Sequence, residues 1–333
     1  MTSALMQQKK WLAYALYFLF TVAFLLFPLG FSSYAVSLLT EILIYGMFAL
    51  SLNLLMGYTV LPSFGHAAFF GVGAYTLALL STKVIPGSGF LNFLTVAGFA
   101  ILASLITSMV FGMIVVRSSG ATFLMLTLAL AQVLWAISVS WQSLTGGDDG
   151  VADIARPDLM LSFSLGQTVN FYYFVLFFFI LSYVILLRIV RSPFGHALIG
   201  IRENELRMRA IGYNTWLCKY IAYIVAGVFG GLAGVLHVYF NRYVNPHVLA
   251  IDLSGMAMFM VIIGSRAIFF GPLVGAATVL LLTHLIGSVT EYWPFVLGMV
   301  FVVSVMYARK GITAYVIDYM MRATRGSNGS IKT

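Results

Sequence analysis

Long apolar runs, separated by short breaks rich in glycine, proline and charge, occupy most of the chain. A helix needs about 20 mostly apolar residues to cross a hydrocarbon core of about 30 Å. The short alternating strands of a membrane β-barrel do not fit these continuous runs of Leu, Phe, Gly and Ala. We therefore predict an all-α, polytopic transmembrane bundle. About ten spans are expected, near residues 11–31, 34–57, 62–82, 91–116, 121–141, 170–190, 216–239, 250–265, 271–290 and 294–308.

Composition agrees with this pattern. Hydrophobic residues make up 61% of the 333 residues and charged residues 8%, against about 45–50% and 25% in soluble domains. The single cysteine, Cys218, excludes an internal disulfide and a thiolate metal cluster. The net charge of +8 includes no basic run long enough for a phosphate-binding stripe, so no nucleic-acid partner is expected.

Lysine and arginine are distributed very unevenly between the two sides of the predicted bundle. With the N-terminus inside, only Lys83, Arg156 and Arg242 fall in outer loops. The inner side collects Lys9, Lys10, Arg117, Arg188, Arg191, Arg202, Arg207, Arg209, Lys219, Arg266, Arg309, Lys310, Arg322, Arg325 and Lys332. Because short cytoplasmic loops hold the positive charge, both termini are predicted to be cytoplasmic.

Two hydrophilic segments interrupt the apolar pattern. The outer segment, 142–169, opens with the turn-rich run Thr145–Gly150, which suits a folded loop or a short re-entrant element. The inner segment, 192–214, alternates apolar and charged residues and predicts a short amphipathic helix outside the membrane. A solvated loop held near anionic membrane lipid by its arginines is the alternative. The acids Glu203 and Glu205 favour a protein partner instead.

Several motifs, in order, resemble the permeases of branched-chain amino-acid ABC importers, in particular the LivM type. They are Leu52–Tyr58, Ser63–Gly71 continuing to Tyr75, Leu126–Gln132, Leu144–Gly147 with Gly150, Ser192–Gly195 continuing to Glu205, and Gly230–Gly234. The order matches the family from about residue 40 to 280. One departure is the turn from Gly264 to Pro272, where Arg266 adds bulk and charge.

The resemblance implies a single permease domain, 1–333. It has a membrane bundle at 11–308, a periplasmic loop at 142–169, a cytoplasmic coupling loop at 192–214 and a cytoplasmic tail at 309–333. The coupling loop is expected to contact an ATPase through Gly195, Arg202, Glu203, Asn204, Glu205, Ala210 and Gly212.

The expected complex lies in a bacterial inner membrane. It contains a second, LivH-like permease, two cytoplasmic ATPase subunits and a periplasmic substrate-binding protein, although a homodimer of this chain is left open. Leucine, isoleucine, valine or related hydrophobic amino acids are the implied substrates. The same permease type also serves urea, short amides and some aromatic acids.

The hairpin from Ser51 to Tyr75 is a candidate translocation path, because interrupted helices at membrane depth expose backbone groups only where they line a cavity. The alternative is a tight hairpin whose glycines allow close packing. The candidate path residues are Asn53, Ser63, Gly65, His66, Thr127 and Gln132. For His66, a hydrogen-bonded structural role is favoured over a gate or ligand role.

No phosphate-binding G-x-x-x-x-G-K-[ST] motif is present, so ATP and Mg²⁺ would be used by the partner subunits and no cofactor or metal is expected on this chain. An intramembrane enzyme would need a catalytic constellation, and none is visible. A secondary transporter would need ion ligands in the membrane core. Glu41 and Asp252 are the candidates for that alternative.

Overall fold

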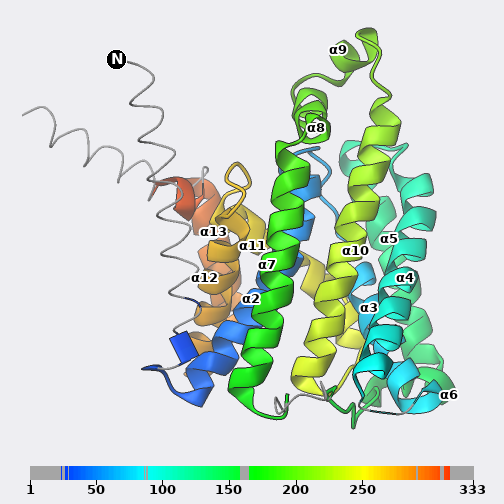
Figure 1. Ribbon diagram of the computed structural model, residues 1–333. Helices are drawn as coiled ribbons and strands as arrows, with labels where there is room; N and C mark the ends of the chain where they lie inside the picture. The colour runs from blue at the N-terminus through cyan, green and yellow to red at the C-terminus, as the bar shows by residue number, and fades with distance from the viewer. Residues whose placement is uncertain are drawn as a thin grey trace, which may run out of the picture.

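The computed structural model describes residues 24, 27–28, 30–85, 87, 89–157, 165–289, 292–307 and 311–315 (Figure 1). This part of the chain is helical apart from its connections and an isolated antiparallel bridge between Val151 and Val244. The predicted all-α class is therefore confirmed. Most of the first predicted span, 11–31, and of the predicted tail, 309–333, lie outside the described residues.

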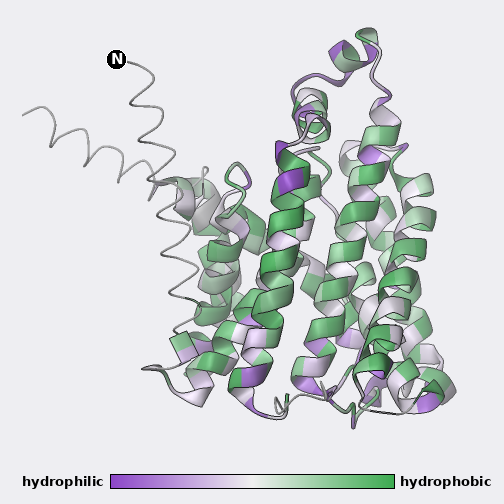
Figure 2. Ribbon diagram, in the orientation of Figure 1, coloured by the Kyte–Doolittle hydropathy of each residue, from purple (hydrophilic) through white to green (hydrophobic). Residues whose placement is uncertain are grey.

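Six helical segments are long and apolar enough to cross a membrane. They are α2 (Ser33–Met56), α3 (His66–Leu79) continued by the π-helical turn η1 (Leu80–Val84), α4 (Phe90–Val115), α5 (Gly120–Ser140), α7 (Thr168–Arg191) and α10 (Thr215–Asn241). The chain is a multi-pass membrane protein. Figure 2 shows that the residues of these helices are hydrophobic along most of their length.

Three predicted spans correspond to shorter apolar helices. These are α11 (Ile251–Gly264), α12 (Gly271–Gly287) and α13 (Trp293–Tyr307). At 1.5 Å per residue, the 14 residues of α11 and the 17 residues of α12 rise about 21 and 26 Å. Both fall short of a hydrocarbon core of about 30 Å. The structure thus supports six full-length spans in the described residues.

The centre of the bundle is formed by α2, α3 and α10. In α2 and α10, 67% of the most apolar stretch is buried inside the protein. In α4 and α5, the buried share of the corresponding stretch is only 28% and 22%. Phe69 on α3 meets Tyr223 on α10 edge to face at 5.4 Å, and both side chains are fully buried. The outer helices α4 and α5 therefore present most of their surface to lipid or to another chain.

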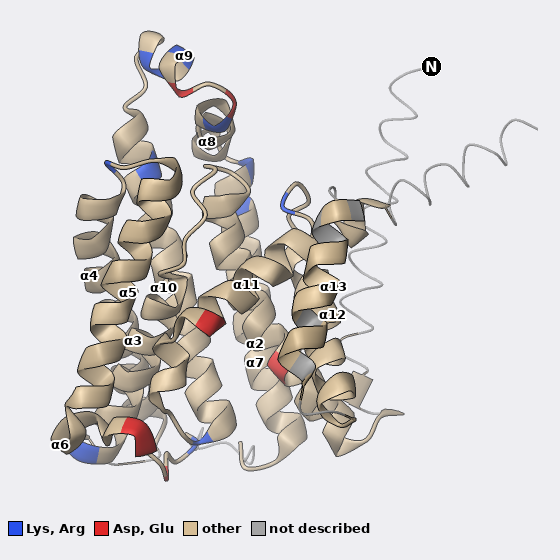
Figure 3. Cartoon of the chain, turned by 180° about the vertical axis from the view of Figure 1, so that it is seen from behind, with Lys and Arg blue, Asp and Glu red and all other residues tan. Residues whose placement is uncertain are grey.

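The short helices lie at opposite ends of the bundle. α8 (Pro193–Glu203) and α9 (Glu205–Ala210) project beyond one end, while α6 (Gln142–Thr145) and η2 (Gly147–Asp149) lie at the other (Figure 1). Lysine and arginine gather near α8 and α9, where acidic residues also lie, and acidic residues appear again beside α6 (Figure 3). The gathering of lysine and arginine at one end agrees with the uneven distribution that the sequence predicts.

The outer segment is folded and fixed to the helix ends. Arg156 donates hydrogen bonds to the carbonyls of Tyr239 (2.9 Å) and Phe240 (3.0 Å) in the last turn of α10. Its guanidinium also lies 4.2 Å from the centre of the Phe171 ring. Burial, together with the nearby cation Arg242, lowers the pKa of Arg156 to about 10. Arg156 thereby caps α10, because its donors satisfy carbonyls that a helix end leaves unpaired.

The inner segment differs from the single amphipathic helix that its sequence predicts. The chain forms α8, takes extended backbone angles at Asn204 and starts again as α9. The Asn204 side chain accepts a hydrogen bond from the Arg207 amide (2.9 Å), so Asn204 is the N-cap that separates the two helices. Gly212 (φ +93°) follows the end of α9.

Candidate translocation and coupling site

The chain between α2 and α3 is not helical, as expected for the interrupted hairpin that the sequence predicts. α2 ends at Met56 and α3 begins at His66, with Val60 at a left-handed φ of 54° between them. A Cβ on Gly65 would lie 2.4 Å from the Thr127 carbonyl oxygen on α5. Only glycine therefore lets the start of α3 approach the backbone of α5 this closely.

His66 is held inside the bundle by Ser51. The Ser51 hydroxyl donates to the Phe48 carbonyl (2.7 Å), and the same oxygen lies 2.8 Å from Nε2 of His66. Ser51 and Nε2 of His66 therefore share a hydrogen bond whose direction follows the tautomer of the ring. The ring stacks on Phe48 at 5.0 Å and has no exposed surface. These contacts favour a structural role for His66.

A second interruption lies between α10 and α11. It contains the 3-10 turn η3 (Pro246–Leu249), which packs against α3 and α5. The amide of Ala67, in the first turn of α3, donates to the hydroxyl of Ser254 in the first turn of α11 (2.9 Å). The starts of α3 and α11 therefore meet inside the bundle, a relation between residues 187 positions apart that the sequence pattern does not reveal.

The candidate path residues are mostly enclosed by the chain itself. Asn53, Ser63, His66 and Thr127 are buried, and Gln132 on α5 is half-buried. Both side-chain amide atoms of Asn53 are buried and have no hydrogen-bond partner among the described residues. The structure brings Gly65 and Thr127 together.

Helix α8, in the predicted coupling loop, contacts the break between α2 and α3 directly. Nη1 of Arg202 donates to the carbonyl of Gly57 (2.9 Å), the C-cap residue of α2. Nε and Nη2 of Arg202 both donate to Glu203 (3.1 and 2.7 Å). The sequence assigns Arg202 to the coupling loop, but the contact with Gly57 joins residues 145 positions apart and has no local signal.

Helix α9, also in the predicted coupling loop, is held by Glu205. This carboxylate accepts hydrogen bonds from Arg209 Nη2 (2.7 Å), Thr215 Oγ1 (2.9 Å) and the buried Lys219. Partial burial acts to raise the pKa of Glu205, but the hydrogen bonds from these three donors outweigh it and hold the pKa below the ordinary carboxyl value. Glu205 thus joins α9 to the first turns of α10.

The remaining predicted coupling residues divide by exposure. Gly195 is buried in α8, where a Cβ would lie 2.0 Å from the Val190 carbonyl oxygen. Glu203, Asn204, Ala210 and Gly212 are exposed at the end of the bundle.

The two acidic residues that the sequence singles out lie in different surroundings. Glu41 on α2 is 3.1 Å from Nε2 of His284 on α12. Asp252 is exposed in the first turn of α11 and has no ion-pair partner among the described residues. No group of three His, Cys, Asp or Glu side chains in that part of the chain is placed to hold a metal ion.

Comparison with known proteins agrees with this architecture. The family model described as branched-chain amino acid transport system / permease component matches residues 34–305. The LivM permease protein of the high-affinity branched-chain amino acid transport system of Salmonella typhimurium is 26% identical over 307 residues, covering 86% of this chain and 71% of its own length.

Two further relatives match at similar identity. LivM of Escherichia coli K12 is 26% identical over 320 residues, covering 88% of this chain and 74% of its own. A probable LivM permease protein of Methanocaldococcus jannaschii is 26% identical over 254 residues, covering 67% and 72%. No solved structure is a significant match. The family model matches most of the length of this chain, so the chain belongs to the family of branched-chain amino acid transport system permease components.

Proposed function

We propose that this chain is one permease subunit of an ATP-driven importer in a bacterial inner membrane. It would have about ten spans, both termini in the cytoplasm, and α8 and α9 seated on an ATPase. The observation that carries the proposal is the hydrogen bond from Arg202 to the Gly57 carbonyl. This bond connects α8, which lies outside the bundle, directly to the interrupted hairpin inside the bundle.

The proposed partners are a second, LivH-like permease, two cytoplasmic ATPase subunits and a periplasmic substrate-binding protein. The translocation path would be formed with the second permease, since the path residues within this chain are enclosed. The exposed faces of α4 and α5 leave ample surface for lipid or another subunit. ATP would be hydrolysed by the partner subunits alone.

The proposed substrates are leucine, isoleucine, valine or related hydrophobic amino acids, following the names of the LivM relatives. Urea, short amides and aromatic acids are the alternative within the same permease type. Uptake of radiolabelled leucine, urea and benzoate by cells expressing the complete importer separates these substrate classes. Uptake of leucine that is competed by valine and not by urea is the expected result.

Affinity purification of the tagged chain in mild detergent tests the assembly. We expect stoichiometric ATPase subunits and a second permease, with ATP hydrolysis by the purified complex. Recovery of the intact chain alone, without an ATPase, would contradict the proposal. It would favour a gradient-driven carrier and direct attention to Glu41 and Asp252.

A further inference from the structure

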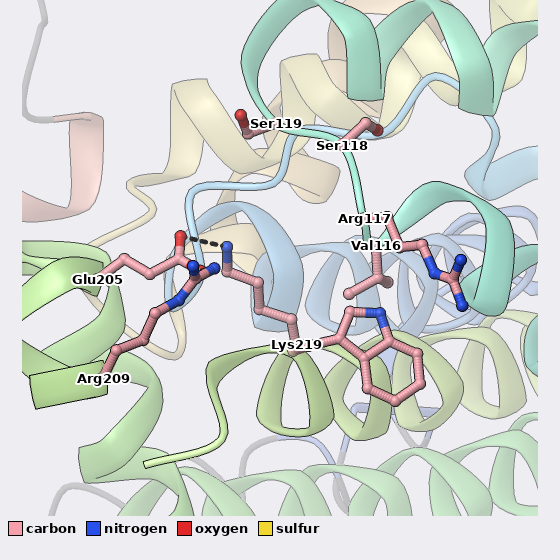
Figure 4. A pocket seen from close by; sticks show the side chains of 8 residues that line it. Val116, Arg117, Ser118, Ser119, Glu205, Arg209 and Lys219 are labelled. Atoms are coloured by element: carbon pink, nitrogen blue, oxygen red, sulfur yellow. Dashed lines mark hydrogen bonds and ion pairs between the residues drawn. The ribbon is translucent and has the colours of Figure 1, made fainter. Parts of the chain in front are cut away.

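A polar cavity of about 260 Å³ opens at the α8–α9 end of the bundle. It lies between the 116–119 connection of α4 to α5, helix α9 and the first turns of α10, as Figure 4 shows. Its lining consists of Val116, Arg117, Ser118, Ser119, Glu205, Arg209, Trp216 and Lys219. Three cations against one carboxylate give the cavity a net charge of +2.

Only some of the positively charged side chains of this cavity are paired with an acidic residue. Glu205 accepts from Arg209 and Lys219, which fixes both side chains in the cavity wall. Arg117 lies on the opposite side in Figure 4 and, among the described residues, has neither an ion pair nor a hydrogen bond. A guanidinium offers five donors in a planar fork that matches the oxygens of a phosphate. The cavity therefore has room and unsatisfied positive charge for a phosphate group.

The surface next to the cavity is apolar and exposed. Met113 and Ile114 at the end of α4 are 55% and 50% exposed, and Leu217 and Ile221 at the start of α10 are 44% and 40% exposed. The two helix ends are tied together by the Tyr220 hydroxyl, which donates to the Met109 carbonyl (3.1 Å).

The aromatic lining residue belongs to the same surface. Trp216 stacks on Tyr220 with ring centres 5.0 Å apart, and its indole N–H has no hydrogen-bond partner. Tryptophan is enriched where a membrane helix meets the headgroup region. A soluble anion would make no use of the apolar flank, whereas a phospholipid presents a charged headgroup and apolar chains together.

We propose that this cavity binds the phosphate headgroup of an anionic phospholipid, with its acyl chains along the ends of α4 and α10. Basic pockets between transmembrane helices on the cytoplasmic side are known to hold such headgroups. The inference rests on the proposed function only in assigning the site to the cytoplasmic leaflet. Because Glu205, Arg209 and Lys219 also hold α9, the bound lipid would brace the coupling segment.

Native mass spectrometry of the purified full-length chain tests the site without ATP, substrate or partner subunits. The chain is released from nanodiscs of equal phosphatidylglycerol and phosphatidylethanolamine, and the retained lipids are counted. Phosphatidylglycerol should be retained preferentially. Arg117→Gln should weaken its binding about tenfold, the contribution of one hydrogen bond from a charged donor. The variant leaves every hydrogen bond of Glu205 in place.

Arg188→Gln is the matched control, because Arg188 is an exposed cation in the last turn of α7 and does not line the cavity. It should retain lipid as the unchanged chain does. Equal retention by all three proteins, or an equal loss in both variants, would overturn the proposal.

Two further outcomes separate the sources of the anion. Inorganic phosphate or glycerol 3-phosphate at millimolar concentration could displace the lipid in a way that depends on Arg117. That result would show that the cavity binds a soluble anion and not a lipid. Loss of a co-purifying ATPase from Arg117→Gln, with lipid retention unchanged, would show that the cavity receives an acidic protein side chain. The proposed function is tested separately by co-purification and uptake, so failure of one does not imply failure of the other.

Discussion

Arg202→Met should separate ATP hydrolysis from uptake. The substitution keeps most of the side-chain volume but removes the hydrogen bond to the Gly57 carbonyl. If closure of the ATPase moves α8, this bond is the direct means by which the movement reaches the end of α2. Its loss should leave α8 free to move without the interrupted hairpin.

The size of the effect follows from the bond. A hydrogen bond from a charged donor contributes about 1.5–3 kcal/mol. The Arg202 side chain is 32% exposed, so we take the lower end of that range. A change of about 1.4 kcal/mol alters an equilibrium constant tenfold. Because a coupling free energy cannot exceed the interactions that carry it, leucine imported per ATP hydrolysed should fall by up to about tenfold.

The assay measures radiolabelled leucine uptake and ATP hydrolysis on the same proteoliposomes of the complete importer. Arg207→Met is the control, because Arg207 is an exposed arginine of α9 without an ion pair among the described residues. It should couple normally.

An unchanged ratio of uptake to hydrolysis in Arg202→Met would refute the reasoning. So would loss of the ATPase subunits from the purified variant, because Arg202 would then act by docking. Co-purification of the variant complex therefore has to accompany the uptake assay.

Three further predictions concern the stability of the detergent-solubilised chain, followed by thermal unfolding. Gly65→Ala should destabilise it by about 1–3 kcal/mol, because the new Cβ meets the Thr127 carbonyl; an unchanged midpoint would show that α3 and α5 adjust freely. Ser51→Ala should cost about 1–3 kcal/mol, because it leaves Nε2 of His66 buried and without its hydrogen-bond partner; Ser51→Thr should recover part of the loss. The ionised Glu205 carboxylate stabilises the folded chain, because its pKa is lower in the folded than in the unfolded chain. This stabilisation is fully present above the ordinary carboxyl pKa and is lost as the pH falls through the lowered value. The midpoint should therefore drop more on acidification below about pH 4.5 in the unchanged chain than in Glu205→Gln, and parallel curves would contradict this.

The sequence predicts the helices well where one physical rule decides. Long apolar runs must be helical in a membrane because every backbone group has to be satisfied within its own segment. The predicted spans 34–57, 91–116, 121–141 and 170–190 lie close to the helices observed. The gathering of lysine and arginine near α8 and α9 follows from the preference of positive charge for one side of the bilayer.

Contacts between distant segments are beyond such reasoning. Nothing in the local sequence shows that Arg202 meets Gly57, or that Ala67 meets Ser254. The break in the coupling segment depends on a side-chain cap at Asn204, and a helical continuation fits the apolar pattern equally well. Helix lengths such as that of α11 depend on how the neighbouring turns pack, which periodicity does not record.

The turn after α11 contains Arg266, the residue at which the sequence departs from the resemblance to the permease family. Arg266 is exposed, and the contact with the rest of the site comes from its carbonyl oxygen. A Cβ on Gly57 would lie 2.6 Å from that oxygen and 2.5 Å from Oδ1 of Asn53. The end of α2, the coupling helix through Arg202 and the turn at Arg266 thus converge on one glycine. An unusual side chain at position 266 leaves this convergence intact, because a backbone atom makes the contact.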